Sequence, residues 1–278
     1  MEPGTGLAIL GSALGGARII EKILGPTAEY IGAGVKNWTE RRVNNVVNIF
    51  LKAEKKLGDR IEEPGSIPPR VLKVVLDEGS FCNDSLVAEY FGGVLASSRS
   101  QVDRDDRGAS WSNLVARLSS YQVRSHFLIY RAIYDRFHGQ DFTFTTVDRD
   151  KLLILLPFSS YQRSMEFSES EIKQFNMLLS HSLFGLDKEG LIEKFAFGAP
   201  KNLRTGMDKE GFHTPAEGGI RVTPSPLGAE LFLWAHGHGN LGLPDLLHLE
   251  LNIPDGIVPC ATALSIEDLK NKNTEQDD

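Results

Sequence analysis

Hydrophobic residues recur at helical spacing through the first half of the chain. Between residues 38 and 57 they form one stripe beside a charged face, and Gly58 stands where that helix should end. The stripe consists of Val43, Val46, Val47, Phe50, Leu51 and Leu57. The pattern therefore predicts a long amphipathic helix.

Further helices are predicted in quick succession. Asn83, Asp84 and Ser85 offer cap chemistry for a helix whose Gly92-Gly93 pair indicates close packing against a neighbour. The other predicted helices lie at 71–76, at 110–118, and from Ser119 or Ser120 through Phe137. The first half is thus expected to form a multi-helix body.

Beyond Gly139 the helical periodicity gives way to short apolar runs. Segments 142–147 and 152–157 are predicted to be extended, with a buried helix as the alternative for the second. Ser168 and Glu171 form a capping box, which predicts that another helix begins there.

Two strands and a helix are expected after this point. The strands are predicted at 193–197 and 219–222, and the closing helix runs to about Ala235. A helix, a short turn, two strands around a loop and a second helix follow the order of a winged-helix-like module. The fold class is therefore mainly α, with a multi-helix N-terminal body and a small α+β winged-helix-like C-terminal module.

This pattern divides the chain into four parts. A Gly-rich apolar segment covers 1–25, the helical body 26–140 and the winged-helix-like module 141–264. Residues 265–278 are polar and charged, which predicts a disordered tail.

The composition indicates a folded chain whose charge is unevenly distributed. A chain of 278 residues that is 41% hydrophobic can bury a sizeable core. Its net charge of −7 is uneven, because residues 1–140 hold 18 Lys and Arg against 16 Asp and Glu, whereas residues 141–278 hold 12 against 21. The net charges of the two halves are therefore +2 and −9. An acidic second half disfavours phosphate binding there.

The two cysteines carry no motif. Cys82 and Cys260 lie far apart and outside any Cys-x-x-Cys pattern, so neither a disulfide framework nor a zinc site is predicted. Two cysteines without a disulfide pattern fit a protein of the reducing cytosol.

The N-terminal segment allows two interpretations. Its apolar residues have roughly helical spacing, and Gly11 and Gly15 would let a second helix approach closely. One interpretation is an arm that packs on the protein's own core. The other is self-association or contact with a membrane surface through Leu7, Leu10, Gly11, Leu14, Gly15, Ile19, Ile20 and Ile23.

Membrane insertion and secretion are not predicted. No run of about 18 uncharged apolar residues is present. The N-terminus also lacks the basic lead of a secretion signal. The expected location is the cytoplasm, with peripheral association at the inner membrane as a variant.

Several short motifs occur in an order that resembles one bacterial family. They are Leu24-Gly-Pro-Thr-Ala-Glu-Tyr-Ile-Gly, the Lys-Ala-Glu-Lys-Lys-Leu end of the first long helix, Pro68-Pro-Arg-Val-Leu, Asn83-Asp-Ser-Leu-Val-Ala-Glu-Tyr-Phe-Gly-Gly-Val-Leu-Ala-Ser and the segment 111–119. Over most of residues 20–240 the chain is similar to the Abi-alpha, or abortive infection alpha, family. The resemblance implies a role in resistance to bacteriophage, and the family supplies no catalytic residues to carry over.

Candidate catalytic and metal chemistry is sparse. His236 and His238 are spaced to share a metal ion, but the glycines beside them are more typical of a helix end and a turn. The acidic cluster 103–106 is interrupted by arginine, which favours an internally paired loop over a cation site. Nucleophile-elbow, phosphate-loop, zinc-protease and kinase patterns are absent from the sequence. No cofactor is predicted.

The expected function is therefore non-enzymatic defence against phage through contact with a protein partner or a second copy of the chain. One alternative is a winged-helix regulator that binds nucleic acid through Arg204, Lys209 and Arg221. The other is a hydrolytic effector with scattered acidic residues, for which Asp105, Asp106 and His238 are the first candidates.

Overall fold

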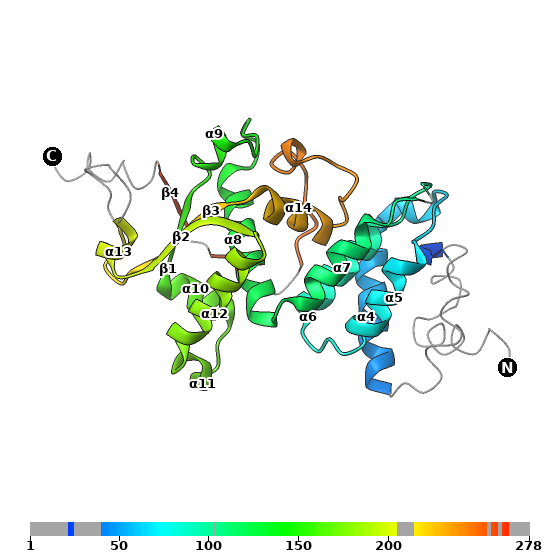
Figure 1. Ribbon diagram of the computed structural model, residues 1–278, viewed down its shortest axis with the longest axis horizontal. Coiled ribbons are helices and arrows are strands. Elements are labelled where there is room, and N and C mark those ends of the chain that lie inside the picture. The colour runs from blue at the N-terminus through cyan, green and yellow to red at the C-terminus, as the bar shows by residue number, and fades with distance from the viewer. Residues whose placement is uncertain are drawn as a thin grey trace. The chain divides into compact units, whose positions relative to one another are not determined.

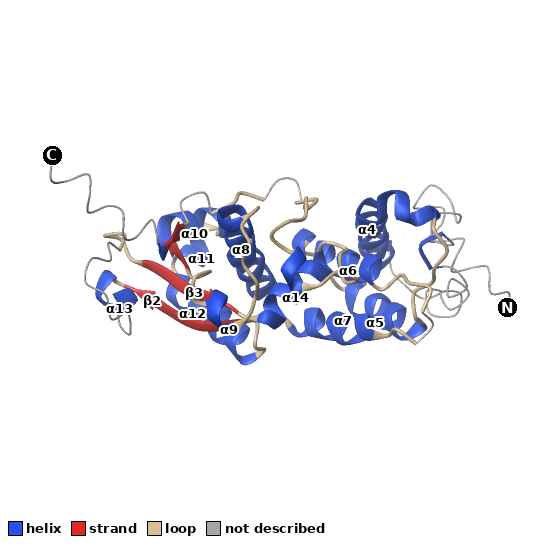
Figure 2. Ribbon diagram, turned by 90° about the horizontal axis from the view of Figure 1, so that it is seen from above, coloured by secondary structure: helices blue, strands red, loops and turns tan. Residues whose placement is uncertain are grey.

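The computed structural model describes residues 22–24, 40–102, 104–204, 214–254, 257–260 and 263–266. The structure is mainly helical, with one small antiparallel sheet of four strands (Figures 1 and 2). The chain divides into two compact units. The first comprises Met1–Ser120, Leu233–Leu241 and Leu251–Pro254, and the second comprises Tyr121–Phe232, Gly242–Glu250 and Asp255–Asp278.

The first unit is built from helices. Its elements are α4 (Glu40–Leu57), the 3-10 helix η2 (Gly58–Glu62), α5 (Pro69–Gly79), α6 (Ser85–Ser97) and α7 (Arg107–Arg117). Gly58 has a φ of +52°, which a residue with a side chain rarely adopts, and α4 ends there as predicted.

The amphipathic stripe of α4 is confirmed with one exception. Val43, Val46, Val47 and Phe50 are buried, whereas Leu51 is 45% exposed. Leu51 lies about 100° around the helix from Phe50, because each residue of an α-helix turns by that angle. The buried face is completed by Ile49 and Ala53.

Close packing at the glycine pair of α6 is also confirmed. A Cβ atom added at Gly92 would lie 3.0 Å from the carbonyl oxygen of Ile49 in α4. One added at Gly93 would lie 1.9 Å from the carbonyl oxygen of Ala235. Both glycines therefore let another backbone approach α6 more closely than a larger residue would allow.

Asp84 caps α6, and its replacement should destabilise the first unit. Its Oδ1 accepts hydrogen bonds from the backbone N–H groups of Leu86 and Val87, each at 2.9 Å. We expect Asp84→Ala to lower the free energy of unfolding by about 1 kcal/mol. Asp84→Asn should retain most of the stability, because an asparagine side chain also caps a helix. Urea unfolding followed by tryptophan fluorescence measures this, because all three tryptophans lie within the first unit. Equal stability of Asp84→Ala and the unmodified chain would contradict the capping role.

The second unit contains the sheet. Its elements are α8 (Ser120–Phe137), α9 (Thr146–Arg149), β1 (Ile154–Pro157), α10 (Phe158–Met165), α11 (Glu169–Ile172), α12 (Phe175–Lys188), β2 (Ile192–Gly198), α13 (Pro200–Arg204), β3 (Gly219–Pro224), the 3-10 helix η3 (Leu243–Asp245) and β4 (Leu264–Ser265). Helix α14 (Pro226–Ala235) belongs to this unit as far as Phe232, and its last three residues belong to the first unit. The strand order is β2-β3-β1-β4, and every pair is antiparallel.

The order of these elements agrees with the predicted α+β module. The strand β1 and the helices α10 to α12 precede the β2–β3 pair, and β3 lies between β2 and β1. The capping box is present at Ser168 and Glu171, although the helix it begins is the short α11, and α12 starts separately at Phe175.

The strand predicted at 142–147 is wrong. No strand forms there, and α9 begins at Thr146. The carboxylate of Asp148 instead accepts hydrogen bonds from the backbone N–H and the hydroxyl of Thr143, at 3.0 and 2.7 Å. This local bonding holds the segment in a turn, so the alternation of Phe and Thr reflects the burial of Phe144 rather than a strand.

Helix α8 packs within the second unit, although the sequence pattern places it in the helical body. The buried hydroxyl of Tyr130 donates to the carbonyl oxygen of Leu191 at 2.8 Å and accepts from the N–H of Ser225 at 2.9 Å. Burial raises the pKa of Tyr130. His126 Nε2 lies 3.0 Å from the carbonyl oxygen of Gly228. These long-range bonds join α8 to Leu191 just before β2, to Ser225 just before α14 and to Gly228 within α14.

Candidate protein-contact surface and cavity

Helix α12 occupies the position that carries nucleic-acid contacts in many winged-helix proteins, since it immediately precedes the β2–β3 pair. Leu179, Leu183 and Leu186 face the core and are buried. The exposed positions are Asn176, Met177, His181, Phe184, Asp187 and Lys188. With a single Lys beside an Asp, this exposed face lacks the basic residues that phosphate binding requires.

An aromatic surface instead joins α12 to β2. Phe184 is 57% exposed, and its ring centroid lies 5.4 Å from that of Phe195 and 6.2 Å from that of Phe197, both edge-on. Phe195 and Phe197 point to the same side of β2, because alternate residues of a strand share a face, and their rings are within 2° of parallel. We call Phe184, Phe195 and Phe197 the aromatic surface.

The aromatic surface borders a free strand edge. β2 is at the end of the strand order, so among the described residues one side of its backbone has no neighbouring strand. An exposed Phe184 beside two half-buried phenylalanines at a strand edge is typical of an interaction site. Nearby in sequence, Ile172 and Met177 are 49% and 59% exposed and line a hollow of about 380 Å³.

Of the basic residues proposed for nucleic-acid binding, the structure describes Arg204 and Arg221. The guanidinium of Arg221 donates to the carbonyl oxygen of Leu203 at 2.8 Å, and burial lowers its pKa. Arg204 is exposed and lies within 3.4 Å of the Thr214 hydroxyl. Lys209 lies outside the described residues.

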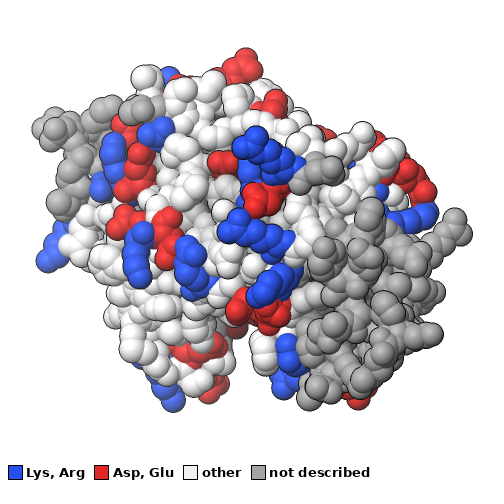
Figure 3. Space-filling model, turned by 45° about the vertical axis from the view of Figure 1, so that its right-hand side comes forward, with Lys and Arg blue, Asp and Glu red and all other residues white. Residues whose placement is uncertain are grey.

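Surface charge is mixed rather than basic. On the face shown in Figure 3, Lys and Arg side chains stand beside Asp and Glu instead of forming a continuous field of one sign. In the second unit, Arg149 pairs with Glu193 at 2.9 Å and Lys194 pairs with Asp150 at 2.7 Å. Glu193 and Lys194 lie on β2, so the edge strand carries both charges.

The metal and hydrolase candidates are not assembled into a site within the part of the chain that the structure describes. No group of three or more His, Cys, Asp or Glu residues is placed there to hold a metal ion. His236 is buried, and burial followed by the charge of Arg60 lowers the pKa of His238. Asp105 is held by Arg107 through two bonds of 2.8 Å, and Asp106 pairs with Arg70 at 2.9 Å.

Of the N-terminal residues predicted to face a membrane or a second copy, the structure describes Ile23 alone. It is fully buried, and the carbonyl oxygens of its neighbours Lys22 and Leu24 accept hydrogen bonds from Arg99 and Ile67. At this residue the segment packs on the protein's own core. Leu7, Leu10, Gly11, Leu14, Gly15, Ile19 and Ile20 lie outside the described residues.

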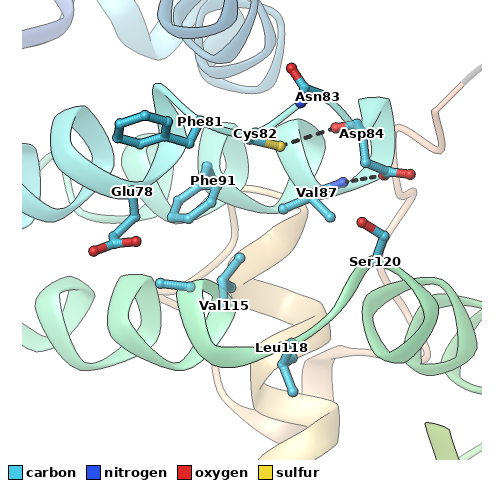
Figure 4. Close-up of a pocket in the computed structure, with 11 residues that line it drawn as sticks. Glu78, Phe81, Cys82, Asn83, Asp84, Val87, Phe91, Val115, Leu118 and Ser120 are labelled. Atoms are coloured by element: carbon cyan, nitrogen blue, oxygen red, sulfur yellow. Dashed lines mark hydrogen bonds between the residues drawn. The ribbon is translucent and has the colours of Figure 1, made fainter. Parts of the chain in front are cut away.

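The first unit contains a cavity of about 490 Å³ (Figure 4). It opens where the turn from α5 to α6 meets the residues that follow α7, and Phe91 and Val87 of α6 lie across it from Val115 of α7. Cys82 lines it, and its thiol lies 3.2 Å from the carbonyl oxygen of Asp84. Burial raises the pKa of Cys82, which disfavours the thiolate that a nucleophile needs.

Neither the aromatic surface nor the cavity is predicted from the sequence. The available signal was the i, i+2 pair of phenylalanines in a short strand, which is equally typical of a buried core face.

Within the described residues, no helix is both long and apolar enough to cross a bilayer. Comparison of the chain with models of protein families, with curated proteins and with solved structures gives no match.

Proposed function

We propose that the chain acts in resistance to bacteriophage as a non-enzymatic protein, and that the aromatic surface on α12 and β2 binds a protein partner. The order of the Abi-alpha-like motifs supports the role in defence. The contact mode is supported by one observation above all, the exposed Phe184 that packs edge-on against Phe195 and Phe197.

Aromatic side chains suit protein contact for a physical reason. They remove a large apolar area from water with few rotatable bonds, and they are enriched at the centres of protein interfaces. The acidic second half also favours a protein partner over nucleic acid, because its net charge of −9 repels a phosphate backbone. The expected partner presents apolar side chains to this surface.

Infection of bacteria that carry the gene tests the role in defence. We expect a lower phage titre than in cells with an empty plasmid for at least one phage of a panel. Uptake of propidium iodide, followed in the same cultures, separates two modes of action. Early dye entry would support membrane damage, whereas a low titre with intact membranes would locate the target elsewhere. Unchanged titres for every phage would contradict the proposal.

The membrane or self-association role of the N-terminal segment is tested separately. Because Lys22, Ile23 and Leu24 are anchored in the first unit, deletion of residues 1–21 is the appropriate change. If the segment acts on a membrane, the shortened protein should remain folded and lose protection. Retained protection would remove this part of the proposal.

A winged-helix regulator that binds nucleic acid is the second candidate, favoured by the order of β1, α12, β2 and β3. It predicts binding to DNA or RNA that weakens steeply as salt rises. We expect no shift in gel-mobility titrations at low salt. A shift that Arg204→Ala weakens would favour this candidate instead, since Arg204 is exposed.

A further inference from the structure

One apolar layer of the sheet is closed over β3 and open over β2. Directly paired residues of antiparallel strands share a face, and Phe195 and Phe197 pair with Val222 and Ile220. Val222 and Ile220 are fully buried, whereas Phe195 and Phe197 are only half-buried. A further strand beside β2 would therefore continue a layer that is incomplete at the sheet edge.

The outer side of the β2 backbone can accept such a strand. An edge strand directs alternate N–H and C=O groups away from its one neighbour. Among the described residues, only β3 is hydrogen-bonded to the backbone of residues 193–198. The outward groups of β2 therefore remain for water or for a strand from another molecule.

The charges on β2 are compatible with a second copy of the same strand. Glu193 pairs with Arg149 and Lys194 pairs with Asp150, so each charge is balanced within its own unit. Residues 195–198 are uncharged. Such an edge offers no excess of one sign to a strongly acidic or basic partner, and it does not repel a copy of itself.

The side chains of β2 also match one another in one register. When the same edge of two copies meets across a two-fold axis, the two strands run antiparallel. With the axis at Ala196, Phe195 lies opposite Phe197 of the second copy, and Lys194 lies opposite a glycine. A register centred on Lys194 would instead set two like charges directly opposite each other, which destabilises a sheet.

We infer that the partner of the aromatic surface is a second copy of this chain, whose β2 pairs with β2 of the first copy across a two-fold axis at Ala196. This pairing joins two four-stranded sheets. It also brings both copies of Phe184, Phe195 and Phe197 into one apolar layer. The inference rests on the proposed use of the aromatic surface for protein contact.

Sedimentation velocity of the full chain over a dilution series tests the dimer. We expect a mass that approaches twice the 30.7 kDa of one chain as concentration rises. Ala196→Lys should weaken dimerisation at least about fivefold, because two lysines would meet at the axis. Val147→Lys adds the same charge at a residue of this unit that is 74% exposed, and should dimerise as the unmodified chain does. Equal dimerisation of both folded variants would overturn the inference.

Cysteine cross-linking tests the register without relying on Ala196→Lys. In Ala196→Cys the two thiols would lie directly opposite each other, within reach of a disulfide. In Lys194→Cys they would lie about 13 Å apart along the strands. We expect mild oxidation to give a covalent dimer of Ala196→Cys alone, above the background set by the natural Cys82 and Cys260. Equal or stronger cross-linking of Lys194→Cys would overturn the inference.

These results separate the inference from the proposed function. A chain that is monomeric at every concentration, yet loses protection against phage on replacement of Phe184 and Phe197 by serine, uses the aromatic surface for a different protein. That result would overturn the inference and leave the proposed function standing. A dimer with the expected register, whose serine variant still protects fully, would support the inference and contradict the proposed function.

Discussion

Glu89→Ala should lower the free energy of unfolding of the first unit by about 3–5 kcal/mol, the usual loss when one member of a buried ion pair is removed. Glu89 in α6 pairs with Lys56 and, at 2.5 Å, with Lys52, both in α4. The Lys56 side chain is only 3% exposed. Without Glu89, that ammonium group would stay out of water with no opposite charge beside it.

Urea unfolding followed by tryptophan fluorescence measures the loss. Asp77→Ala is the matched control, because it breaks an exposed ion pair with Lys73 and should cost well under about 1 kcal/mol. Adding Lys56→Met to Glu89→Ala should restore much of the stability, since the unpaired charge is then gone. A loss no larger than that of Asp77→Ala would contradict the account.

The same carboxylate makes stability depend on pH. Burial by itself raises the pKa of Glu89, but Lys56 and Lys52 outweigh burial and lower it below the ordinary glutamate value. The unfolded chain therefore takes up this proton more readily than the folded chain. The stabilising contribution of ionised Glu89 is fully present at pH values above the ordinary glutamate pKa of the unfolded chain. It is lost as the pH falls through the lowered pKa of the folded chain. Glu89→Gln should flatten this part of the stability profile.

Gly93→Ala should cost about 3 kcal/mol or more. The new Cβ would lie 1.9 Å from the carbonyl oxygen of Ala235 and 2.6 Å from its Cα. Because the obstacle is backbone, no side-chain rotation relieves the clash. The gain of about 1 kcal/mol in helix propensity on replacing glycine is too small to offset it.

Thermal unfolding by circular dichroism measures this effect. Gly242→Ala is the control, because its added Cβ would meet atoms at 3.5 Å or more, which is ordinary contact. We expect that control to match the unmodified chain within about 0.5 kcal/mol. Equal stability of Gly93→Ala and Gly242→Ala would show that α6 does not approach Ala235 as closely as described.

Local features of the fold could be predicted from sequence. Asp84 caps α6 and Gly58 ends α4 because both effects depend on a few adjacent residues. The close packing at Gly93 was predicted, but its partner Ala235 was not, since nothing in a periodic pattern identifies a contact so distant in the chain. Segment 142–147 was mispredicted because strand-like alternation also arises in a turn held by Asp148.

The aromatic surface and the cavity could not be predicted for the same reason. Phe184, Phe195 and Phe197 are residue types that usually fill a core, yet Phe184 is exposed and the other two are only half-buried. The cavity depends on where the residues after α7 pass α6, and Val115 and Phe91 look like ordinary core residues in sequence. The exposure of Phe184 and the place of the cavity are both set by tertiary packing.

Phage plating on cells that express variants of the aromatic surface tests the central claim most directly. The variant is Phe184→Ser with Phe197→Ser, and the control is Val147→Ser, an exposed apolar residue of the same unit at 74% exposure. Circular dichroism and expression level confirm that each protein is folded and present. The account predicts that the double variant plates phage as an empty plasmid does, while Val147→Ser protects fully. Full protection by the folded double variant would contradict it.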